Sequence, residues 1–175
     1  MRKLFLLLFY IIISLLFMSS CGKEKENQEI NLGEKFIKEL YNVDEPSVDI
    51  NDSSPEDLIE FQNKFSSYFT EDEFTNLASI RFFLLPQEVS NKQNSKISVE
   101  NISFTKRTDH QNERTTNFDF TFTLILTNHN KDIIDKFEVK GQMSIIESNN
   151  ELKINRYYDH EPLKDVLYRN EDTTN

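Results

Sequence analysis

The spacing of apolar residues changes once along the chain, from steps of three and four to steps of two, near residue 95. Before that point three runs have helical spacing, because residues three and four apart share one face of an α-helix. We predict helices over residues 32–42, from Ser54-Pro55 onward, and from Thr70 to Pro86. The apolar residues of the three runs are Leu32, Phe36, Ile37, Leu40 and Tyr41; Leu58, Phe61, Phe65, Tyr68 and Phe69; and Phe74, Leu77, Ala78, Phe82 and Leu85.

Signals at the helix ends support these boundaries. Ser54 is a favoured N-cap and Pro55 suits the first helical position. Thr70 followed by Glu73 fits a capping box, in which each side chain bonds the other residue's backbone. Pro86 is expected to end the third helix, since proline interrupts helical hydrogen bonding.

Beyond residue 95 the period of two predicts four β-strands. Residues 117–127 give the clearest one, in which alternate positions are apolar. In the strand before it the parity reverses, which predicts a β-bulge near Glu100-Asn101. The third strand starts at Ile133 and the fourth follows a turn at 148–150. The residues expected to share the inward parity are Ile97, Val99, Ile102, Phe104, Phe118, Phe120, Phe122, Leu124, Leu126, Ile133, Asp135, Phe137, Val139, Gly141, Met143, Ile145, Leu152, Ile154 and Tyr158.

The order of elements predicts an α+β domain over residues 32–168. Short connections between consecutive strands favour an antiparallel meander. One strand face is apolar and the other is polar, so the N-terminal helices are expected to pack on one face of a four-stranded, curved sheet. This order resembles the cystatin-like and NTF2-like folds, in which a curved sheet wraps around helices to form a cone. The resemblance covers residues 32–160 and rests on pattern, without a diagnostic motif.

The amino terminus has the form of an export signal. Arg2 and Lys3 precede an apolar run that is somewhat short for a membrane span, so residues 1–20 are interpreted as a signal peptide. The sequence Met18-Ser19-Ser20-Cys21 resembles the lipobox of bacterial lipoproteins, although leucine is commoner than methionine at the first position. The resemblance implies cleavage before Cys21 and attachment of lipid, including palmitate, to its thiol. An uncleaved anchor and a plain secretory signal are the alternatives.

The polar residues 21–31 are interpreted as a tether between lipid and domain, and residues 169–175 as a polar tail. Removing Arg2 and Lys3 from the 20 basic residues leaves 18 against 30 acidic ones, a formal net charge of −12. Such a charge argues against a nucleic-acid partner. With Cys21 as the only cysteine, the chain forms no intramolecular disulfide.

Candidate chemistry is sparse. The acidic loop 43–53 lacks the glycine and distant glutamate of an EF-hand, and His110, His129 and His160 lack metal-ligand spacing. We therefore expect no metal, no cofactor and no catalytic residues. One polar group is a possible site, at the inward parity of the third strand and at the end of the fourth: Asp135, Arg156, Tyr157, Asp159 and His160.

These patterns predict a non-catalytic lipoprotein domain anchored at the extracytoplasmic face of the cell membrane, with a Gram-positive source favoured by composition. In a Gram-negative cell the same signal would place it in the periplasm or at the outer membrane. The expected partners are the membrane, through lipid on Cys21, and an envelope protein or a small apolar ligand. The resemblance fits this, since related folds occur in secretion and conjugation machinery and in small envelope lipoproteins. The rival hypothesis is a small-molecule carrier or NTF2-like enzyme that uses the cone interior.

Overall fold

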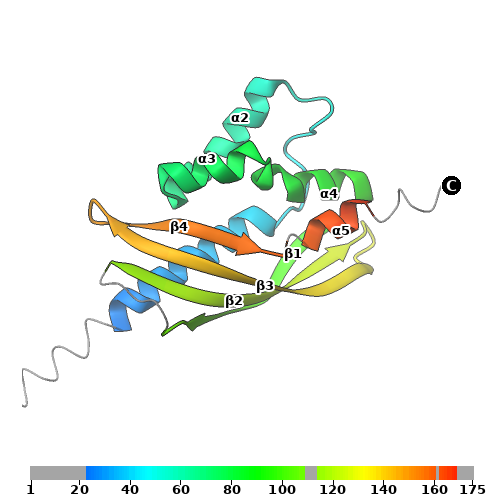
Figure 1. Cartoon of the computed structure of the whole chain (residues 1–175). Coiled ribbons are helices and arrows are strands. Elements are labelled where there is room, and N and C mark those ends of the chain that lie inside the picture. The colour runs from blue at the N-terminus through cyan, green and yellow to red at the C-terminus, as the bar shows by residue number, and fades with distance from the viewer. Residues whose placement is uncertain (1–22, 109–113, 161, 169–175) are drawn as a thin grey trace, which may run out of the picture.

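The computed structural model, which describes residues 23–108, 114–160 and 162–168, confirms the predicted α+β architecture (Figure 1). Helices come first in the chain, and an antiparallel sheet in the order β1-β2-β3-β4 follows. A helix over residues 23–41 crosses one face of the curved sheet, and α2 and α3 lie beyond its β4 edge. The later elements are α2 (Pro55–Asn63), η1 (Ser66–Tyr68), α3 (Glu71–Ser79), η2 (Phe82–Leu84), α4 (Leu85–Gln93), β1 (Lys96–Lys106), β2 (Thr115–Thr127), β3 (Ile133–Ser148), β4 (Glu151–Asp159) and α5 (Pro162–Tyr168).

The first helix is longer than predicted, because residues 23–31 are helical and belong to the folded unit. The prediction of an irregular tether was wrong for these residues. Its error has a physical reason: the helical face that meets the sheet continues through Lys25, Glu29 and Gly33, and Ile30 is the one apolar residue of 23–31 that packs against the core. In residues 23–31, charged side chains that bond to the strands occupy positions facing the sheet. A hydropathy pattern therefore does not reveal this part of the helix.

Of the two capping signals predicted for the middle helices, the one at α2 is formed and the one at α3 is not. Ser54 and Asp57 form the reciprocal bonds of a capping box at the start of α2. At α3 the predicted box is absent, because Glu73 instead accepts a hydrogen bond from the backbone of β4. Pro86 was expected to end a helix but lies in the first turn of α4, where its missing N–H costs no hydrogen bond. The left-handed conformation of Arg81 separates α3 from η2.

The sheet confirms the predicted register along most of its length. Phe118, Phe120, Phe122, Leu124 and Leu126 of β2 all point inward and are at most 1% exposed. The bulge in β1 lies between Glu100 and Ser103, as predicted.

Near the end of β4 the predicted parity was wrong. A second bulge shifts the register there, since Ser144 of β3 pairs with Arg156 while Ile145 pairs with Ile154. One extra residue reverses the faces of the strand. Tyr158, predicted inward, is therefore 50% exposed, and Tyr157 is 5% exposed.

The space between the first helix and the sheet is filled by aromatic rings. Phe36 lies at their centre and is fully buried. Its ring meets Phe65, Phe69 and Tyr157 edge-on, with centroids 6.3, 4.8 and 5.1 Å away. Edge-to-face contacts of this kind add stability beyond the buried area. They join the first helix, the segment around η1 and β4 into one core.

Segments outside the sheet bond to both edge strands. At β4, Phe69 bridges to Ile154, and the Thr70 N–H donates to the Ile154 carbonyl at 3.0 Å. The Tyr157 N–H of the same edge donates to Glu73 Oε1 at 2.7 Å. These bonds hold α3 against the sheet and occupy groups that an edge strand otherwise leaves open.

At the β1 edge, the segment that follows the first helix likewise bonds to the edge strand. Val43 and Ile97 exchange two backbone hydrogen bonds of 2.9 Å each. The Val99 N–H donates to Asn42 Oδ1 at 2.9 Å. The first helix is thereby fixed at its C-terminal end to the strand that begins the sheet.

Two glycines allow close approaches. A Cβ at Gly33 would lie 2.7 Å from the ring of Phe104 and 3.1 Å from the sulfur of Met143, so glycine lets the first helix sit close to the sheet. At Gly141 in β3, a Cβ would overlap the Phe120 ring and the backbone oxygen of Tyr158. The two sites differ, because side-chain ends move more easily than a strand backbone.

We expect Gly141→Ala to lower the free energy of unfolding by about 1–3 kcal/mol, the usual range for overpacking. Gly33→Ala is the matched control. It gains about 1 kcal/mol of helix propensity and meets only side chains, so we expect a smaller net loss. Urea unfolding of the three proteins measures both effects. A Gly33→Ala protein less stable than Gly141→Ala would contradict this account.

Candidate functional site

The structure divides the polar group predicted from the sequence. Tyr157 and Asp159 point into the core, while Arg156 and His160 are exposed. Asp135 lies near the start of β3, opposite Leu126. The β3 residue opposite Arg156 is Ser144, nine positions further along, which corresponds to about 30 Å of strand. Asp135 and Arg156 are therefore too far apart to form an ion pair.

The inward members form a buried cluster with a residue that the sequence analysis did not select. Asp159 Oδ2 accepts hydrogen bonds from the hydroxyls of Tyr41 and Tyr157, the latter at 3.1 Å. Asp159 and Tyr41 are each 2% exposed. Tyr41 comes from the last turn of the first helix, and its spacing assigns it to the core. The signal that could have identified Tyr41 as part of a polar cluster is its hydroxyl, since a buried tyrosine usually has a hydrogen-bond partner.

The environment of Tyr157 opposes ionisation of its hydroxyl. Burial raises the pKa of Tyr157 well above its ordinary value, and the neighbouring Asp159 carboxylate raises it further. The rings of Phe36, Phe82 and Phe120 surround it, with centroids 5.1–5.4 Å away. At neutral pH the hydroxyl is therefore a proton donor to Asp159.

This cluster joins two elements of the fold, the first helix and β4, and has a structural role in the present conformation. It ties the first helix to β4 through a carboxylate whose charge is met by two donors, as a buried charge requires. Since Tyr41, Tyr157 and Asp159 are each at most 5% exposed, a solute does not reach them without movement of the surrounding rings.

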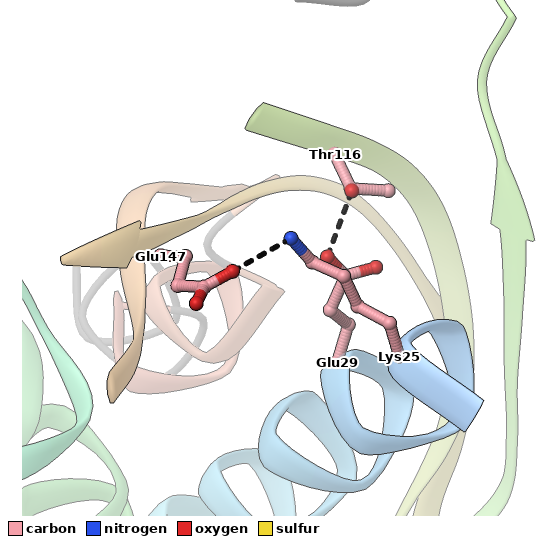
Figure 2. A network of polar contacts seen from close by, with 4 residues as sticks. All are labelled: Lys25, Glu29, Thr116 and Glu147. Carbon is pink, nitrogen blue, oxygen red and sulfur yellow. Dashed lines mark hydrogen bonds and ion pairs between the residues drawn. The ribbon is translucent and has the colours of Figure 1, made fainter. Parts of the chain in front are cut away.

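The opposite end of the first helix is held by a second polar network (Figure 2). Lys25 donates to Glu147 of β3 at 2.9 Å, and Thr116 of β2 donates to Glu29 at 2.8 Å. Glu29 is 2% exposed, so its bond is made away from water. The helix is thus fixed to the sheet at both ends, and residues 23–31 have a defined direction.

The outward face of the sheet carries a shallow polar pocket of about 180 Å³. We call it the outer-face pocket. Arg156, one of the predicted candidates, lines it. Its other lining residues are Arg107, Asn117, Phe118, Gln142, Met143 and Ser144.

Several predicted features have no counterpart in the described part of the chain or lie outside it. Cys21 and His110 fall outside the described residues. His129 bonds Asn94, with 2.9 Å between Nε2 and Oδ1, and His160 makes an edge contact with the ring of Tyr158. Within residues 23–108, 114–160 and 162–168, no three His, Cys, Asp or Glu side chains are grouped to hold a metal ion. No helix within these ranges is long and apolar enough to cross a membrane.

Comparison with known proteins supports the fold alone. No protein-family model matches the chain, and no curated protein sequence matches it significantly. A solved structure described as a periplasmic fragment of TraM is similar, with a TM-score of 0.51 and 9% sequence identity. The match covers 77% of this chain and 96% of that one. At this identity the similarity concerns the arrangement of helices and sheet.

The raised pKa of Tyr157 predicts a pH dependence of stability. In the unfolded chain the hydroxyl ionises near pH 10, whereas in the fold it stays protonated to higher pH. Its contribution to stability is therefore fully present below about pH 10 and is lost as the pH rises further. We expect the free energy of unfolding to fall above that pH, and Tyr157→Phe to fall less steeply. Urea unfolding at a series of pH values measures this. Parallel curves for the two proteins would refute it.

Proposed function

We propose that this protein is a membrane-anchored extracytoplasmic lipoprotein whose α+β domain binds another envelope protein without catalysing a reaction. The observation that carries the proposal is the sequence Met18-Ser19-Ser20-Cys21 at the end of a charged and then apolar N-terminal segment. Cleavage before Cys21 would remove the apolar segment from the protein. Lipid on Cys21 would then anchor the protein stably to the membrane.

The first helix supports a close and oriented attachment. Only Gly22 separates Cys21 from the first described helical residue, Lys23. The helix is tied to β2 and β3 near this end by the bonds of Glu29 and Lys25 (Figure 2). An anchored domain would therefore sit next to the membrane with the β3–β4 hairpin on the membrane side.

The packing of the interior favours a protein partner over the carrier alternative. The cone is filled by aromatic contacts around Phe36, and its polar cluster is bonded internally. A carrier or enzyme that used the cone would have to displace these rings, losing their packing energy. Binding through the surface requires no such change.

Labelling of growing cells with a clickable fatty acid tests the anchoring. We expect label on the wild-type protein and none on Cys21→Ala, because the thiol is the proposed acceptor. Ser20→Ala is the matched control, since it keeps a small residue beside the cysteine and should retain the label. A labelled Cys21→Ala protein would exclude lipid attachment at this position.

Site-specific photo-crosslinking in intact cells tests the binding role. A photoreactive amino acid is placed at Tyr158 on the sheet or at Ile59 on α2, both of which are at least half exposed. We expect a discrete adduct with one envelope protein from at least one position. Samples kept in the dark control for prior covalent linkage. If neither position gives a discrete adduct, the binding role is contradicted.

A further inference from the structure

The outer-face pocket is built by one row of residues that starts directly after β1 and crosses β2, β3 and β4. The Arg107 N–H, directly after β1, donates to the Asn117 carbonyl of β2 at 2.8 Å. Asn117 pairs with Ser144 of β3, which pairs with Arg156 of β4. Two long cationic side chains at the ends of the row thus flank two short polar ones in the middle, and all four line the same pocket.

The bulge in β4 is what places Arg156 on this face. Because Asn155 is the extra residue, Arg156 pairs with Ser144 on the outward side while Tyr157 turns into the core. The irregularity that buries the tyrosine therefore also supplies the second arginine of the pocket.

The hydrogen bonds within the pocket leave donors for a ligand. Ser144 Oγ donates to Asn117 Oδ1 at 2.6 Å, so the Asn117 amide nitrogen remains available as a donor. Arg156 has no hydrogen bond or ion pair anywhere in the described residues, although it carries a full charge. Guanidinium and amide N–H groups arranged in this way match an oxygen anion.

The charges beside the pocket select among anions. Asp119 lies 3.6 Å from an Arg107 nitrogen and accepts a bond from Gln142 at 3.1 Å. The lining holds Arg107 and Arg156 and no acidic side chain, while Asp119 lies beside it, so the charges of the described residues favour an anion over a cation. Asp119 opposes each further negative charge on a ligand, so a singly charged carboxylate meets less repulsion there than a doubly charged phosphate.

We propose that the outer-face pocket binds a carboxylate group, held between Arg107 and Arg156 with the Asn117 amide as a third donor. In the anchored protein this would be a carboxylate of the partner, so the assignment of its source rests on the proposed binding function. The sheet face would then be the docking surface, with one charge-matched contact near the end of the sheet where β2 begins.

Side-chain NMR of the ¹⁵N-labelled full-length protein in detergent micelles tests the pocket. Sodium acetate is titrated while ionic strength is kept constant with sodium chloride. We expect the Nε resonances of Arg107 and Arg156 to shift together and to saturate. Arg156→Gln should weaken acetate binding at least about tenfold, the loss expected for one charge-assisted contact. Lys140→Gln removes one positive charge from the same sheet at an exposed position outside the pocket, and should change affinity less than about twofold.

Three results would overturn the assignment: shifts that do not saturate, an equal loss in Lys140→Gln, or tighter saturation of the same arginines by inorganic phosphate. The source of the carboxylate is tested by crosslinking from Tyr158 in the Arg156→Gln protein, where we expect the adduct to be lost. An undiminished adduct would show that the partner does not use the pocket and would leave the binding function intact. Saturable acetate binding in a protein that forms no adducts would instead count against the binding function and support the pocket.

Discussion

The packing of Phe36 is the contact on which the rest of the domain depends. A single four-stranded sheet has one apolar face, and that face needs a partner layer to exclude water. Phe36 supplies the centre of that layer, with edge contacts to Phe69 and Tyr157 from elements far apart in the sequence. Its position determines how the first helix crosses the sheet and how closely the segment around η1 approaches β4.

A single bulge in β4 connects this core to the surface. If the strand were regular, Tyr157 would face solvent and Arg156 would face the rings, leaving an unpaired cation in an apolar interior. The extra residue puts the tyrosine beside Asp159 and the arginine beside Ser144. The buried hydrogen-bond cluster and the outer-face pocket are therefore two results of the same local irregularity.

Sequence patterns were reliable where one physical effect dominated. Along β2 the alternation of phenylalanine and threonine follows from burial of one face, and Ser54 with Asp57 caps a helix by local bonds alone. The α+β architecture followed from these periods. Patterns were misleading where a distant residue competes for a local hydrogen-bond partner. Glu73, for example, accepts a bond from the backbone of β4 instead of capping α3.

The candidate site was predictable only in part for the same reason. Tyr157 and Asp159 were selected, but the bulge that separates them from Arg156 depends on the match between β3 and β4. Tyr41 is assigned only to the core by its sequence, because helical spacing does not show which hydroxyl will meet a carboxylate 118 residues away. Residues 23–31 were misassigned because their inward positions are charged and bond to the sheet.

The hydrogen bonds along the two edge strands, β1 and β4, limit how neighbouring copies of the protein can associate. At β4 the Thr70 and Glu73 contacts occupy backbone groups, and at β1 the Val43 and Asn42 contacts do the same before the bulge bends the strand away. Neighbouring copies therefore find little free backbone with which to extend one sheet into the next.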